Sequence, residues 1–200
     1  MSTYIADTAY VGSNTRVIDD AKIGGKASVY GKACVIGNAQ VYGNAKVSGR
    51  AQVMGSAQVY GNAKVFGEAH VYGNTCVYGD AMVYGRAHVR GNASIGDNAK
   101  VNGEARVLDN AFVGGHAEVI DEAKVYDNAK VYEKAKIAYG SEVGGYAMIS
   151  GTAIVSRFAK VIGYVQVTGD TRIYGNAILE GDVNLSSGRI RNVHWWRDIP

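Results

Sequence analysis

The feature that most constrains this chain is a six-residue period. From Ile5 to Leu185, every sixth residue is Val, Ile or Leu. The residue two places before each of these is nearly always small, mostly Ala, and the residue two places after is mostly Gly or Asp, so the unit is A-x-V-x-G-x. Neither a helical period of 3.6 residues nor a long amphipathic strand produces this pattern.

The repeated unit predicts a short strand followed by a corner. In A-x-V-x, the Ala and Val side chains share one face of the strand and the two x side chains share the other. Gly, Asn and Asp, which dominate the next two positions, tolerate positive φ at little cost and therefore turn the chain. Three such units close a triangular coil of eighteen residues, so residues eighteen apart stack in one column.

The stretch VYGNAKVFGEAHVYGNTCVYGDAMVYGRAHV, residues 59–89, repeats this unit without a slip. It resembles the hexapeptide-repeat family, and its VYGNAKV-type units look like those of uncharacterised bacterial and phage proteins. The resemblance covers about residues 3–185 and implies an all-β fold, a left-handed parallel β-helix of about ten coils. The handedness is implied by the resemblance alone.

The repeat ends after Leu185, which predicts a domain of residues 1–185 and a tail of residues 186–200. An open β-helix end exposes an apolar cross-section and unpaired strand edges, so it needs a cap. We expect Trp195 and Trp196 in the tail either to cover that end or to pack against a neighbouring subunit.

The composition argues against several classes of function. The formal net charge is only +3, which argues against strong non-specific nucleic-acid binding. No stretch is apolar enough to span a membrane, and the N-terminal residues lack the pattern of a signal peptide. Two cysteines, Cys34 and Cys76, form no disulfide framework, which favours a cytoplasmic location. No phosphate-binding loop or dinucleotide fingerprint occurs, and we expect no cofactor.

The first outer face carries a ladder of tyrosines, Tyr42, Tyr60 and Tyr78, flanked by uncharged residues. Aromatic residues suit a solvated β-surface, where they stack on one another. Tyrosine is also favoured at subunit interfaces, and this half of the face has no charge to bury. Because the family resemblance implies homotrimers, we consider this ladder as the oligomer interface.

The second face alternates lysines with aromatic residues. Such an alternation can hold a phosphate and a base together, although a basic face is more often simply solvated. Lysines in one column repel each other and favour an anion. The candidate ligand-binding residues for a small anionic, nucleotide-like ligand are Lys46, Lys64, Phe66, Tyr84 and Lys100.

Histidines are weak candidates for chemistry. His70 and His88 stack on the third face, and the resemblance to γ-class carbonic anhydrases suggests zinc, but Arg90 and Arg106 lie beside them and oppose a metal cation. The resemblance to hexapeptide-repeat acyltransferases implies a histidine general base, for which only His116 is a candidate. The unbroken repeat provides no loops to wall off a catalytic pocket around it.

The repeat departs from its own pattern late in the chain. The corner Gly is replaced at Tyr139 and Arg157, and Phe158, Tyr146 and Tyr164 place aromatic side chains at corners. Exposed aromatic residues at corners usually mark contacts, so these residues, with Trp195 and Trp196, are candidates for binding a protein partner. The alternative is that Tyr139 merely shifts the turn by one residue.

These patterns favour a non-catalytic, rigid binding or scaffold protein, a homotrimer that binds a small anionic ligand or a protein partner. The main alternative is an acyltransferase with an active site between subunits. A zinc protein of the γ-carbonic-anhydrase type is a third interpretation.

Overall fold

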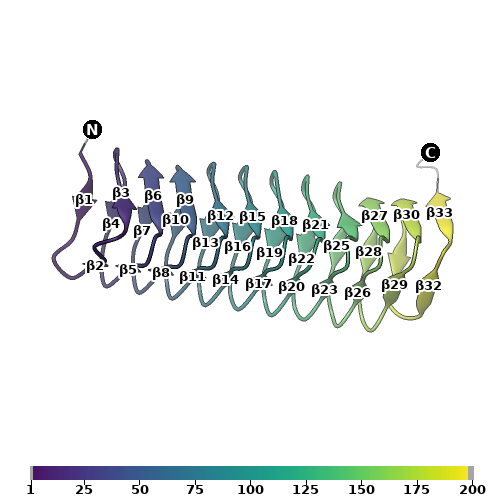
Figure 1. The fold of residues 1–200 in the computed structure, drawn as a ribbon. Coiled ribbons are helices and arrows are strands. Elements are labelled where there is room, and N and C mark those ends of the chain that lie inside the picture. The colour runs from purple at the N-terminus through teal and green to yellow at the C-terminus, as the bar shows by residue number, and fades with distance from the viewer. Residues whose placement is uncertain (1, 198–200) are drawn as a thin grey trace.

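The computed structural model describes residues 2–197, and the side chains of residues 2–195. The chain winds into a straight stack of triangular coils, with the N-terminus at one end and the C-terminus at the other (Figure 1). Each coil contributes one short strand to each of three parallel sheets, and each sheet has eleven strands. The predicted all-β parallel β-helix is confirmed.

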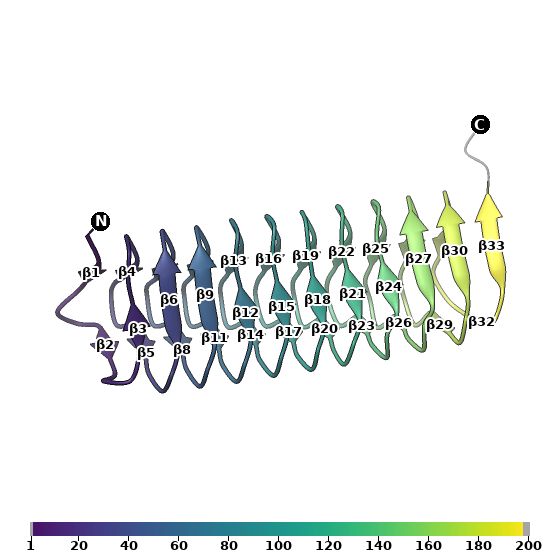
Figure 2. The same cartoon turned by 45° about the horizontal axis from the view of Figure 1, so that its top comes forward.

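The strands of the three sheets interleave along the chain, so that every third strand belongs to the same sheet (Figure 2). The first sheet contains β1 (Tyr4–Ile5), β4 (Lys22–Ile23), β7 (Gln40–Val41), β10 (Gln58–Val59), β13 (Cys76–Val77), β16 (Ser94–Ile95), β19 (Phe112–Val113), β22 (Lys130–Val131), β25 (Met148–Ile149), β28 (Gln166–Val167) and β31 (Asn184–Leu185). The second sheet contains β2 (Tyr10–Val11), β5 (Ser28–Val29), β8 (Lys46–Val47), β11 (Lys64–Val65), β14 (Met82–Val83), β17 (Lys100–Val101), β20 (Glu118–Val119), β23 (Lys136–Ile137), β26 (Ile154–Val155), β29 (Arg172–Tyr174) and β32 (Arg189–Arg191). The third sheet contains β3 (Arg16–Val17), β6 (Cys34–Gly37), β9 (Gln52–Gly55), β12 (His70–Val71), β15 (His88–Val89), β18 (Arg106–Val107), β21 (Lys124–Val125), β24 (Glu142–Val143), β27 (Lys160–Gly163), β30 (Ile178–Gly181) and β33 (His194–Arg197).

The core is the column of valines and alanines that the period predicts. Val59, Val77 and Ile95 are fully buried and pair in register on successive coils of the first sheet. Alanine occupies the small slot on most coils, where a second large side chain would not fit beside the valine. Burial of this continuous apolar interior stabilises the coil, since no single coil has a core of its own.

The described residues form eleven coils rather than the expected ten, because the chain after Leu185 pairs with the coil before it. Arg172 lies opposite Arg189 and Ile178 lies opposite His194, so these two steps are seventeen and sixteen residues instead of eighteen. Trp195 lies opposite Leu179 in an inward-facing column, and its side chain is 44% exposed. This placement suits a residue that covers the end of the core. The Trp196 side chain lies outside the described part of the chain.

Candidate functional site

Two corners that are neighbours in one column, after β23 and β26, differ from the rest. Most corners have one residue with positive φ, such as Gly91 at 79°. At Tyr139–Gly140 both residues have positive φ, 52° and 68°, and at Arg157–Phe158 the values are 57° and 65°. Two positive values are the mark of a type I′ turn, whereas one at the first central position marks a type II′ turn. The turn type therefore changes at these two corners.

The turn itself does not shift. Ala138 accepts a hydrogen bond from the Ser141 backbone N–H at 3.3 Å across the corner, as neighbouring coils do at the same position, and Ser141 fills the core slot fully buried. Glu142 stays in register with Lys160. The alternative that Tyr139 displaces the turn by one residue is therefore wrong.

Backbone hydrogen bonding between the coils also changes here. At a regular corner, the second residue donates its N–H to the corner residue of the next coil, as Glu104 does to the Asp121 carbonyl at 2.6 Å. At the altered corners the bond runs backwards, because the Phe158 N–H donates to the Tyr139 carbonyl of the preceding coil at 3.1 Å. The two altered corners are therefore hydrogen-bonded to each other, and the bond between them differs in direction from the bonds between regular corners.

Asp121 stands at the boundary between the regular and the altered corners. Other corner aspartates accept a backbone N–H from the next coil: Asp97 from Gly115 at 2.8 Å and Asp127 from Gly145 at 2.9 Å. The Oδ2 atom of Asp121 is buried and has no hydrogen-bond partner. A buried carboxylate oxygen without a donor costs free energy, so the regular pattern of corner hydrogen bonds is broken at Asp121.

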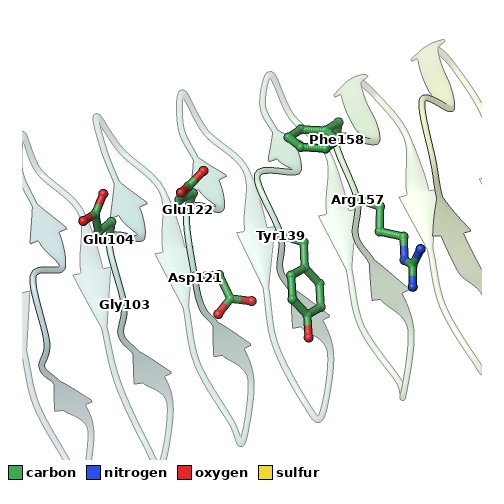
Figure 3. Close-up of a pocket in the computed structure, with 7 residues that line it drawn as sticks. All are labelled: Gly103, Glu104, Asp121, Glu122, Tyr139, Arg157 and Phe158. Carbon is green, nitrogen blue, oxygen red and sulfur yellow. The ribbon is translucent and has the colours of Figure 1, made fainter.

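A groove of about 730 Å³ opens at this boundary, and we call it the corner groove. It is lined by Gly103, Glu104, Asp121, Glu122, Tyr139, Arg157 and Phe158. The Tyr139 and Phe158 side chains are 61% and 65% exposed. Figure 3 shows Asp121 pointing toward Tyr139, while Arg157 points away toward the C-terminal coils.

The corner groove is acidic because a ladder of ion pairs ends there. Along one corner column, Arg50 pairs with Glu68 at 3.3 Å, and Arg86 bridges Glu68 at 3.5 Å and Glu104 at 3.3 Å. The next member of the column is Glu122, and no ion pair with it exists among the residues that the structure describes. Together with Asp121, the groove therefore holds more carboxylates than cations.

Three of the predicted contact residues, Tyr139, Arg157 and Phe158, thus come together in one groove. Tyr146 and Tyr164 lie on a different corner, where their rings stack with centroids 5.0 Å apart and both are 53% exposed. The acidic residues of the corner groove were missed by sequence reasoning. The spacing of eighteen between Glu104 and Glu122, in one column, was the available signal.

The lysines predicted to bind an anion lie in one column, as the period requires, but they are not equivalent. Lys100 pairs with Glu118 at 3.6 Å, and Lys136 pairs with the same carboxylate at 3.5 Å. Lys46 and Lys64 have no ion pair within the described residues. Lys100 thus differs from Lys46 and Lys64, because its ammonium group already has a carboxylate partner.

The aromatic residues beside this column stack. The rings of Phe66 and Tyr84 lie 4.9 Å apart and nearly parallel, and Asn102 donates to the Tyr84 hydroxyl at 2.7 Å. The stack lies next to Lys64, but the two rings already contact each other and the Tyr84 hydroxyl already accepts a hydrogen bond.

The tyrosine ladder is formed as expected. The ring centroids of Tyr42 and Tyr60 are 5.0 Å apart, and those of Tyr60 and Tyr78 are 5.4 Å apart. Partial burial raises the pKa of all three phenols above the ordinary value. The ladder is therefore a neutral, half-buried aromatic surface on the first sheet.

The histidines are placed as the columns predict. The rings of His70 and His88 are 4.9 Å apart, and burial, followed by the charges of His70 and Arg106, lowers the pKa of His88. Within the described residues, no group of three or more His, Cys, Asp or Glu side chains is arranged to hold a metal ion. His116 lies exposed at a corner, and no hydrogen bond to its imidazole is present among the described residues.

Comparison with known proteins agrees with the repeat. A family model described as the YdcK beta solenoid repeat matches residues 39–55 and 57–73. No curated protein matches the sequence. Over the described residues no helix could cross a membrane.

Two solved structures have a similar backbone fold. The UDP-N-acetylglucosamine acyltransferase from Campylobacter jejuni has a TM-score of 0.48 and 21% identity, covering 91% of this chain and 67% of its own. The Arabidopsis UDP-N-acetylglucosamine acyltransferase has a TM-score of 0.40 and 13% identity, covering 88% of this chain and 65% of its own. This chain therefore spans about two thirds of the length of each. At these TM-scores and sequence identities, the similarity is no evidence for an enzymatic activity of this chain.

Proposed function

We propose that this hexapeptide-repeat β-solenoid, of the left-handed β-helix type, is a non-catalytic binding protein that uses the corner groove to hold a protein partner. The observation that carries the proposal is the pair of exposed aromatic side chains, Tyr139 and Phe158, beside an acidic groove of about 730 Å³. Exposed aromatic residues on a rigid frame are typical of contact surfaces.

The chemistry of the groove favours a cationic side chain of the partner, an arginine or a lysine. Glu104 and Glu122 offer carboxylates in the groove, and Glu122 has no ion pair among the described residues. Tyr139 and Phe158 offer ring faces, on which a guanidinium group packs favourably. A partner arginine would therefore pair with Glu122 and cover the aromatic rings in one contact.

The test is affinity capture with the intact protein. Tyr139→Ala with Phe158→Ala should abolish capture of the partner that wild type retains, and Glu104→Gln with Glu122→Gln should weaken it and remove its sensitivity to salt. The matched control is Tyr4→Ala with Tyr10→Ala, because these side chains are also more than half exposed but lie at the N-terminal coil. Equal capture by all variants would overturn the proposal.

The assembly that we propose is a homotrimer with the tyrosine ladder at its interface. The uncharged, stacked surface of Tyr42, Tyr60 and Tyr78 supports it, because an interface core is depleted of charged residues. We also propose a cytoplasmic location, since Cys34 and Cys76 are free thiols.

Acyl transfer with His116 as general base is the second candidate. The resemblance to hexapeptide-repeat acyltransferases supports it, whereas the exposed position of His116 and the lack of a group that orients its imidazole do not. Purified protein with an acyl thioester donor and amine acceptors tests it. Transfer that disappears in His116→Ala would replace the binding proposal with the enzyme.

A further inference from the structure

A second groove, of about 450 Å³, lies at the C-terminal end of the second sheet and has the opposite charge. We call it the arginine groove. It is lined by Ile154, Ser156, Arg157, Arg172, Tyr174, Gly175, Arg189, Arg191 and Asn192. Apart from Arg157, none of these residues lines the corner groove.

The register of the last strands brings the arginines together. Arg172 of β29 lies directly opposite Arg189 of β32, and Tyr174 lies opposite Arg191. The Arg191 guanidinium carbon is 6.0 Å from the centroid of the Tyr174 ring. Arg157 enters from the corner of the preceding coil and points toward these coils (Figure 3). Four guanidinium groups therefore share one concave surface.

Among the described residues, no acid compensates these charges. The lining contains no carboxylate, and within the described residues none of the four arginines forms an ion pair. In the middle of the same sheet, Glu118 pairs with both Lys100 and Lys136, so that one carboxylate serves two cations. Like charges directly opposite on neighbouring strands are destabilising, so the uncompensated pair Arg172–Arg189 favours an anion bound between them.

From this arrangement we infer that the arginine groove binds a small phosphorylated ligand. The planar guanidinium fork matches the oxygens of a phosphoryl group in a two-point contact, and adjacent strands place two such forks side by side. Arg191 and the Tyr174 ring lie next to this pair, where a planar group attached to the phosphate can pack. Lys46 and Lys64 line neither groove, and an ammonium group lacks the planar fork of a guanidinium.

Isothermal titration calorimetry of the full chain, at constant ionic strength, tests the inference with inorganic pyrophosphate and with ADP. We expect both to bind wild type, and we expect Arg172→Gln or Arg189→Gln to weaken each about tenfold. ADP binding tighter than pyrophosphate identifies a nucleotide-like ligand, and equal binding identifies the phosphate groups alone. Either result supports the site.

Thermal unfolding distinguishes ligand binding by Arg172 and Arg189 from a purely structural role of these two arginines. In the absence of ligand, Arg172→Gln with Arg189→Gln should raise the melting temperature, because repulsion is relieved, while pyrophosphate should stabilise wild type and not this variant. Arg106→Gln is the matched control, since Arg106 is an exposed arginine on the third sheet and has no ion pair among the described residues. Failure of both probes to bind, equal weakening by Arg106→Gln, or binding of an oligonucleotide without binding of pyrophosphate would overturn the inference. None of these results bears on the corner groove.

Discussion

Phe158 lies over Gly140 of the preceding coil, so that a Cβ added to Gly140 would come within 3.0 Å of the Phe158 Cε1 atom. Gly140 also has a positive φ of 68°, which residues other than glycine adopt at a cost in free energy. The residue thus has two separate reasons to be glycine. One is the turn, and the other is the aromatic side chain that lines the corner groove.

The first prediction separates these two reasons. Gly140→Ala should lower the free energy of unfolding by more than about 1 kcal/mol and displace Phe158. The same substitution in a Phe158→Ala background is the control, because it keeps the backbone strain at φ 68° and removes the contact with the Phe158 ring. Denaturant unfolding measures both. If the substitution costs the same stability in both backgrounds, the contact with Phe158 contributes nothing.

The second prediction concerns a buried hydroxyl. Thr75 is fully buried in the slot that is usually alanine, and its Oγ1 atom has no hydrogen-bond partner. Thr75→Val should stabilise the protein by about 1 kcal/mol, because it removes an unsatisfied polar atom and keeps the shape. Val165, fully buried in the same kind of slot, shows that valine fits there.

Thr171 is the matched control for Thr75. It is also buried, but its Oγ1 donates to the Thr168 carbonyl at 2.8 Å. Thr171→Val should therefore be neutral or destabilising in the same thermal unfolding experiment. If both substitutions stabilise the protein equally, the missing hydrogen bond of the Thr75 hydroxyl is not the reason that Thr75→Val is stabilising.

The third prediction follows from Glu142. Its carboxylate accepts a hydrogen bond from the Lys124 ammonium at 3.0 Å and lies 3.3 Å from that of Lys160, and these contacts lower the pKa of Glu142 below the ordinary value of 4.5 despite partial burial. A lowered folded-state pKa contributes stability above about pH 4.5, and this contribution is lost as the pH falls through the folded-state value.

Glu142→Gln should therefore be less stable than wild type at pH 7, by less than about 1 kcal/mol because the lysines are exposed to solvent. The difference should shrink as the pH falls below 4.5, and it should also shrink in 1 M salt. Urea unfolding at pH 7, 5 and 3 measures it. A difference that is constant across this range would show that the charge of Glu142 is not the cause.

The fourth prediction tests the proposed trimer. Tyr60→Glu with Tyr78→Glu should place charges in the interface and produce monomers, as measured by light scattering. Tyr132→Glu is the control, because Tyr132 follows β22 of the same sheet beyond the stacked ladder. A trimer that persists in the double variant would place the interface on another face. A monomeric wild type would leave the ladder as a solvated stack.

The sequence by itself determined the coil, the three sheets and the stacking of columns. These follow from a period that never slips, because Val59, Val77 and Ile95 can share one core column only if each coil has the same length. For the same reason the stacking of Tyr42 on Tyr60 and of Tyr146 on Tyr164 could be predicted from their spacing alone.

Only the tertiary structure decided what happens where the period changes or ends. The altered turn at Tyr139–Gly140 accompanies a hydrogen bond from Phe158 in the next coil, and Arg157 lines both grooves while pointing toward the C-terminal coils. After Leu185 the steps of seventeen and sixteen residues set Arg189 opposite Arg172, a register that no repeat specifies. The physical reason is that columns are fixed by local repetition, whereas grooves are fixed by contacts between coils, and those depend on the particular side chains that meet.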